Sequence, residues 1–93
     1  MIVGTLSVRL YAPWVHSLKD KRMVVKSLLA KLHNTFNVSA AETDEQDVHQ
    51  TIILGVACLS GSRAQADSVL QKVLGFIESH TEAEVTDVQL EFL

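Results

Sequence analysis

Hydrophobic and polar residues alternate along both ends of the chain, which is the period of a half-buried β-strand. In residues 2–12, Leu6, Val8 and Leu10 share one face and polar side chains share the other. Residues 84–93 alternate in the same way, and their inward positions are Val88, Leu90 and Phe92. Two internal strands are predicted as well: a short one at residues 38–43, rich in small side chains, and a nearly continuous apolar one at residues 51–59.

Apolar residues repeat at intervals of three and four in two other segments, which predicts amphipathic helices. Ser17 and Asp20 have the spacing of a capping box, and the helix that follows runs to about residue 34. Ser62 and Gln65 repeat this signature before a helix that runs to about residue 79. The apolar stripe of the first helix consists of Leu18, Val25, Leu28, Leu29 and Leu32, and that of the second consists of Ala66, Val69, Leu70, Val73, Leu74 and Ile77.

The resulting order, βαββαβ, predicts an α+β protein with a ferredoxin-like sandwich. Its four-stranded antiparallel sheet would carry both helices on one face, and residues 1–93 would form a single domain. We expect the first and third strands to be the central pair, parallel to each other, with the second and fourth at the edges. The inward positions of the central strands would be Leu6, Val8, Leu54 and Val56.

Charge is distributed unevenly along the sequence. Residues 1–40 hold six of the eight Lys and Arg residues and only one of the 11 acidic residues, Asp20. The net charge of −3 therefore hides a basic first part and an acidic second part. Lys19 and its neighbours lie in the first turn of the predicted helix, where a cation is unfavourable next to the helix dipole. This arrangement favours a nearby anion, although charge runs are most often solvated faces that pair with acids.

The candidate reactive residues do not predict an enzyme. Cys58 has no base at catalytic spacing, so it is not expected to act as a nucleophile. Its position in the apolar strand is typical of a buried thiol in a cytoplasmic protein. Asp44, Asp47 and His49 share one loop and could offer metal ligands, but a solvated hairpin loop is the default interpretation of such a segment. No cofactor is expected. No apolar run approaches the ~20 residues of a membrane span, so no membrane partner is expected either.

Three segments carry a resemblance to a known family: HSLKDKR at residues 16–22, FNVSAAE at 36–42 and LGVA at 54–57. Together they resemble the bacterial YlxP-like family, a domain of unknown function, over essentially the whole chain. The resemblance implies a ferredoxin-like fold and no established activity. Genes of the family often lie near those of a translation initiation factor and a ribosome-binding factor, which implies a ribosome-linked role. Asp20 stands where Glu is more frequent in the family.

Two functions follow as hypotheses. The first is a non-catalytic RNA-binding or ribosome-associated protein, with rRNA or a ribosomal subunit as the partner. Its phosphate-contacting residues would be Lys19, Lys21, Arg22 and Lys26. Trp14 could add base stacking, although an aromatic residue just before a helix more often packs on the core. The alternative is a regulatory or small-anion-sensing homodimer that associates through the uncovered face of the sheet, at Ile53, Ala57 and Leu59.

Overall fold

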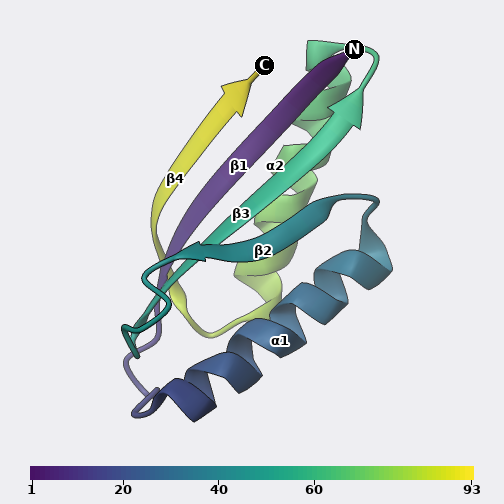
Figure 1. The fold of residues 1–93 in the computed structure, drawn as a ribbon. Helices are drawn as coiled ribbons and strands as arrows, with labels where there is room; N and C mark the ends of the chain where they lie inside the picture. Colours follow the sequence, from purple (N-terminus) through teal and green to yellow (C-terminus); the bar gives the residue numbers. More distant parts are fainter.

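The computed structural model describes residues 1–93 as four strands and two helices in the predicted order (Figure 1). The elements are β1 (Ile2–Tyr11), α1 (Leu18–Thr35), β2 (Ser39–Asp44), β3 (Thr51–Ser60), α2 (Arg63–His80) and β4 (Glu84–Phe92). The N-cap half of both predicted capping boxes is confirmed, because Ser17 and Ser62 are the N-cap residues of α1 and α2 and accept hydrogen bonds from the Asp20 and Gln65 amides. Neither helix has the length and apolarity needed to cross a bilayer.

The sheet has the strand order β2-β3-β1-β4, and all neighbouring strands are antiparallel. The prediction that β1 and β3 are the central pair is confirmed, but the prediction that they run parallel is wrong. The crossover through α1 returns the chain so that β2 runs in the direction of β1. The β2–β3 hairpin then reverses it, and β3 must run against β1.

The hydrophobic core lies between the sheet and the helices. β1 and β3 pair Leu6 with Val56 and Val8 with Leu54, and all four side chains are buried as predicted. The helices close the core with the stripe Val25, Leu28 and Leu32 from α1, and Ala66, Leu70, Val73 and Ile77 from α2. β4 lies at an edge, so Leu90 stays partly exposed although it pairs with buried Leu6.

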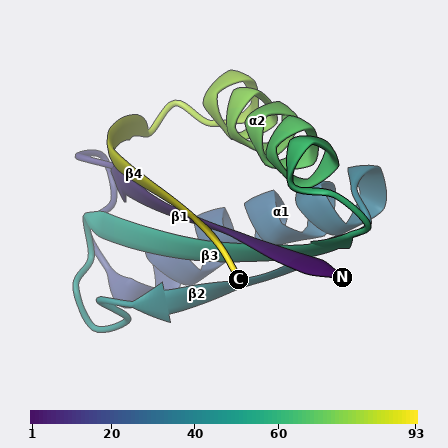
Figure 2. The same cartoon turned by 90° about the horizontal axis from the view of Figure 1, so that it is seen from above.

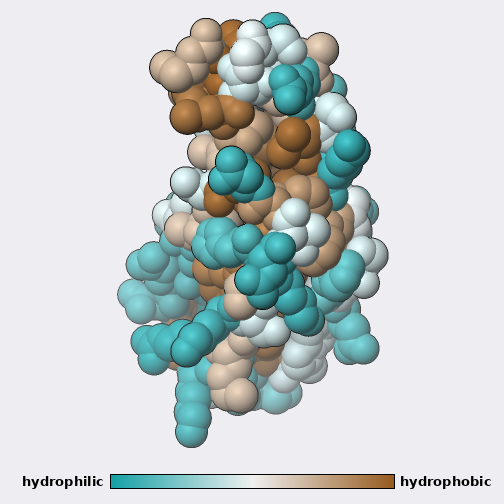
Figure 3. Space-filling model, turned by 90° about the vertical axis from the view of Figure 1, so that its right-hand side faces the viewer, coloured by the Kyte–Doolittle hydropathy of each residue, from teal (hydrophilic) through white to brown (hydrophobic).

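Both helices lie on one side of the sheet, and the other side is uncovered (Figure 2). The two ends of the chain meet at one end of the sheet, where Val3 and Leu93 exchange backbone hydrogen bonds of 3.0 and 2.8 Å. On the side of the molecule that Figure 3 shows, apolar side chains gather near this upper end and polar ones cover much of the lower part.

Candidate nucleic-acid interface

The side of α1 that faces the sheet includes one charged residue, Lys21. It precedes Val25 by four positions, and so lies on the same helical stripe as the buried Val25, Leu28 and Leu32. Its relative exposure is only 1%. Lys21 is therefore not a phosphate-contacting residue, and its place in the predicted binding set is wrong.

Three acceptors surround the Lys21 ammonium group. Its Nζ lies 2.8 Å from Glu42 Oε2, donates a 2.7 Å hydrogen bond to the Val48 carbonyl, and donates another to the Glu45 carbonyl. The ammonium group thus donates two hydrogen bonds to carbonyl groups, and the carboxylate of Glu42 balances its charge. The contact joins α1 to β2 and to the β2–β3 loop, which places Lys21 in the structural framework.

Glu42 depends on Lys21 because it lies on the covered face of β2, opposite buried Leu54. The buried Oε2 atom accepts no hydrogen bond with acceptable geometry, so the nearby ammonium charge is its only partner. A buried carboxylate without a counter-charge is strongly unfavourable. The sequence signal that could have identified Lys21 was its position on the apolar stripe of α1.

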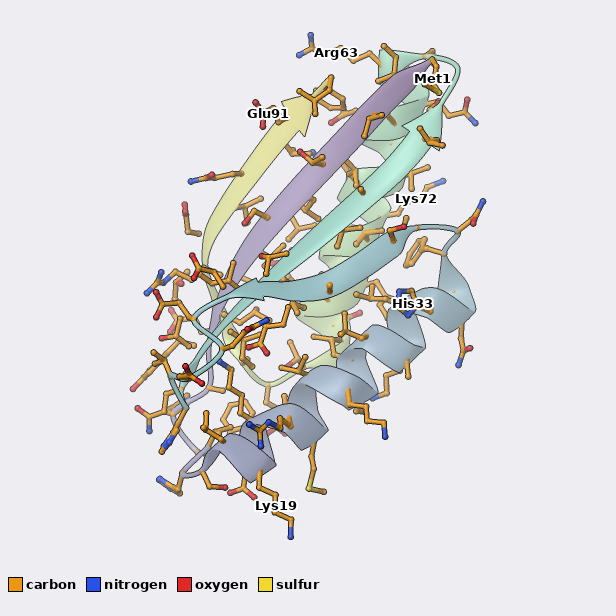
Figure 4. All side chains as sticks on the ribbon, in the orientation of Figure 1. Met1, Lys19, His33, Arg63, Lys72 and Glu91 are labelled. Atoms are coloured by element: carbon orange, nitrogen blue, oxygen red, sulfur yellow. The ribbon has the colours of Figure 1, made fainter.

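The remaining predicted cations, Lys19, Arg22 and Lys26, are exposed on a flank of α1 beside the buried stripe. They occupy positions i, i+3 and i+7 of the helix, so they follow one flank of it. We call these three residues the basic ridge. Figure 4 shows Lys19 extending away from α1 into solvent. The structure has one ion pair within 4.0 Å, between Lys21 and Glu42, so no acidic side chain pairs with the basic ridge.

Shallow grooves lie on either side of the basic ridge. One groove, of about 490 Å³, separates the ridge from β2 and is lined by Arg22, Val25, Lys26, Leu29, Ala30, His33 and Glu42. The other, of about 340 Å³, lies toward the end of α2 and is lined by Trp14, Met23, Val24, Ser27, Leu28, Lys31, His80, Thr81 and Glu82. The basic ridge thus lies between two grooves, and each groove is lined partly by apolar residues.

The uncovered face of the sheet forms a wider hollow of about 860 Å³. Its floor carries small side chains, among them Ser7, Ala41 and Ala57. The central strands offer no aromatic residue on this face except Tyr11 at the end of β1. It therefore lacks the stacking platform by which RNA-recognition motifs hold bases. Leu59 is 70% exposed at the upper end of β3.

The other groups considered from the sequence are not brought together. Cys58 is buried, and its thiol lies 3.9 Å from the carbonyl oxygen of Ala66. Asp44, Asp47 and His49 are exposed in or beside the β2–β3 loop, whose backbone Lys21 holds. None of these four residues lines the grooves beside the basic ridge.

Known proteins resemble this chain in sequence and in fold. The model of a family described as "Protein of unknown function (DUF503)" matches residues 3–90. A protein of Bacillus subtilis (strain 168) named "Uncharacterized protein YlxP" is 45% identical over 76 residues, covering 82% of this chain and 83% of the relative. A de novo designed protein with ferredoxin fold, determined by solution NMR, superposes with a TM-score of 0.68. Its sequence identity is 14%, with 98% of this chain and 86% of that chain covered, so this likeness concerns the fold alone.

Proposed function

The chain belongs to the DUF503 family of proteins of unknown function, and we propose that it is a non-catalytic RNA-binding protein that associates with ribosomal RNA in the cytoplasm. One observation carries the proposal. Lys19, Arg22 and Lys26 form an exposed row of cations, and none of them forms an ion pair with an acidic side chain. The Lys21–Glu42 contact is satisfied within the fold and leaves this row free for an external anion.

The geometry suits the phosphate backbone of RNA better than a single small anion. The basic ridge spans the first half of α1, and it repeats positive charge at intervals along the helix. A polyanion can neutralise all three cations at once and release the counterions that surround it. The acidic residues elsewhere, most of them in the second half of the chain, would limit contact with RNA to this flank.

The salt dependence of binding tests this proposal. Three phosphate contacts at roughly 0.7–0.9 each should give a slope of log affinity against log salt of about −2 to −3. Affinity for structured ribosomal RNA can be measured by fluorescence anisotropy over a salt series. Replacing Arg22 and Lys26 with Ala should flatten the slope by about one to two units.

A matched variant removes the same charges from another surface. Arg63→Ala with Lys72→Ala deletes one Arg and one Lys, both exposed on α2 (Figure 4), and should leave the slope within experimental error of the parent. If the two double variants changed affinity and slope equally, binding would be non-specific charge attraction. If neither variant changed them, the basic ridge would be a solvated face without an RNA partner.

The uncovered face of the sheet favours a second candidate function, a homodimeric regulatory module. Ile53, Ala57 and exposed Leu59 give this face an apolar part that a second copy could cover. Light scattering would then give about twice the 10.2 kDa protomer mass, and Leu59→Lys should return the protein to the monomer. Salt-sensitive co-sedimentation with ribosomal subunits would favour the first function, whereas a dimer that never co-sediments would favour the second.

A further inference from the structure

Trp14 is the only tryptophan of the chain, and its side chain is 43% exposed. It lines a groove together with the core residue Leu28, and its neighbours Ala12 and Val15 are fully buried. A large aromatic ring left half in water between two core residues forfeits part of the stabilisation that its burial would give. Trp14 is therefore only partly buried, and part of its ring stays available to a ligand.

The backbone around Trp14 is held in place. The Val15 amide donates to the Ala12 carbonyl at 3.1 Å, and the Ala12 amide donates to the Gln50 carbonyl at 2.8 Å. The Gln50 side-chain amide donates to the Pro13 carbonyl at 3.0 Å. These bonds and the two buried neighbours fix the turn on both sides of the tryptophan, so its exposure belongs to an ordered segment.

The groove lined by Trp14 reaches the basic ridge through Met23. Met23 follows Lys19 by four positions and precedes Lys26 by three, so it is a neighbour of both on the helix. Lys31 lines the same groove from α1, whereas Glu82 lines it from the segment before β4. Positive charge thus lies on the α1 side of this groove and negative charge on the side before β4.

We infer that Trp14 is a stacking platform for an unpaired base of single-stranded RNA, whose phosphates lie on the basic ridge. The inference rests on the proposed function and narrows its ligand to single strands. The groove volume of about 340 Å³ is near the lower end of the roughly 300–1,000 Å³ of small-ligand sites, which suits one planar base. In a duplex the bases are stacked on each other, and their faces cannot reach the indole.

Tryptophan fluorescence tests the inference directly because Trp14 is the only indole. An oligouridine of about eight nucleotides, a length within the range of single-strand sites, should quench the emission as it binds. An RNA duplex of similar charge should bind through the basic ridge with little change in emission. If the single strand bound without quenching, Trp14 would not stack a base, and the proposed RNA-binding function would stand. If neither RNA bound, the proposed function itself would fail.

Affinity for a labelled oligouridine separates stacking from structural effects. Trp14→Leu should weaken binding about 5- to 150-fold, the loss expected for one base–aromatic stack, and Trp14→Phe should restore most of it. Tyr11→Leu removes another partly exposed aromatic residue, from the uncovered face of the sheet, and should leave affinity unchanged. Equal losses for Trp14→Leu and Tyr11→Leu would overturn the inference. So would emission that changed with protein concentration alone, because Trp14 would then lie at a contact between copies.

Discussion

Basic residues on two sides of α1 have different surroundings. Lys21 faces the sheet, is 1% exposed and contacts Glu42 and two carbonyl groups of the β2–β3 loop. Lys19 and Arg22 are within two positions of it in the sequence, yet both are exposed and neither forms an ion pair. A rotation of about 100° per residue around the helix axis is enough to separate a structural cation from a cation available to a ligand.

The difference shows that a short charged motif need not have one role. Within HSLKDKR, Ser17 caps α1 by accepting a 3.1 Å hydrogen bond from the Asp20 amide, and Lys21 holds β2 and its loop. Lys19 and Arg22 make no comparable contact within the fold. The resemblance to relatives is therefore carried partly by residues that build the fold, and only the exposed remainder supports a binding function.

The largest effect should come from breaking the buried contact. Lys21→Met leaves Glu42 without its counter-charge and two loop carbonyls without a donor, which should lower the free energy of unfolding by about 3–5 kcal/mol. Urea denaturation measures this loss. Arg22→Ala, one position away and exposed, should stay within about 0.5 kcal/mol of the parent. Similar stabilities for the two variants would contradict the distinction between the two sides of α1.

A smaller loss of stability is expected from substitution of Gly55, which belongs to the LGVA segment. Like Lys21, this residue contributes to the packing of the fold. A Cβ added there would lie 2.5 Å from Thr43 Cγ2. Gly55→Ala should therefore destabilise the protein by about 1–3 kcal/mol, as overpacking does. Adding Thr43→Ser removes the obstructing methyl group and should recover most of the loss in thermal or urea unfolding.

Gly75 on α2 is the control for this substitution, because a Cβ there meets nothing within 4 Å. Gly75→Ala should stabilise α2 by roughly 0.5–1 kcal/mol, since alanine is the better helix former. Stabilisation by Gly55→Ala as well would show that Thr43 yields freely, and that Gly55 is not needed for packing.

The smallest effect should have the opposite sign. Lys19 lies in the first turn of α1, close to the positive end of the helix dipole. Lys19→Glu should therefore raise the free energy of unfolding by about 0.3–1 kcal/mol at low salt, while RNA affinity falls. Parallel measurement of unfolding and binding checks both outcomes. A variant that gained stability and kept its affinity would remove Lys19 from the basic ridge.

Sequence periodicity predicted the fold well because each strand and helix has a distinct pattern. Alternation in β1 and the Ser17 and Ser62 caps identified both the elements and the inward positions. The relative direction of β1 and β3 was wrong because it follows from connectivity through α1 and the β2–β3 hairpin. Strand patterns alone do not contain that information.

The candidate site was less predictable because neighbouring basic residues differ in burial and in their contacts, which the local sequence pattern does not show. Lys21 was grouped with Lys19 and Arg22 by charge and proximity in the sequence. Its partners Glu42 and Val48 are more than 20 positions away, and only the folded chain brings them together. The turn that carries Trp14 is likewise held by a residue far away in the sequence, because Gln50 donates to the Pro13 carbonyl. Long-range contacts of this kind leave little trace in local patterns.

The position of β1 between β3 and β4 has a consequence for how the protein is made. The last strand, β4, pairs with the first strand, β1. During synthesis, one edge of β1 therefore stays unpaired until β4 has emerged from the ribosome. Pairing between residues so far apart in sequence is slow, and unpaired strand edges invite association with other chains. The nascent domain is therefore most vulnerable just before its last strand arrives.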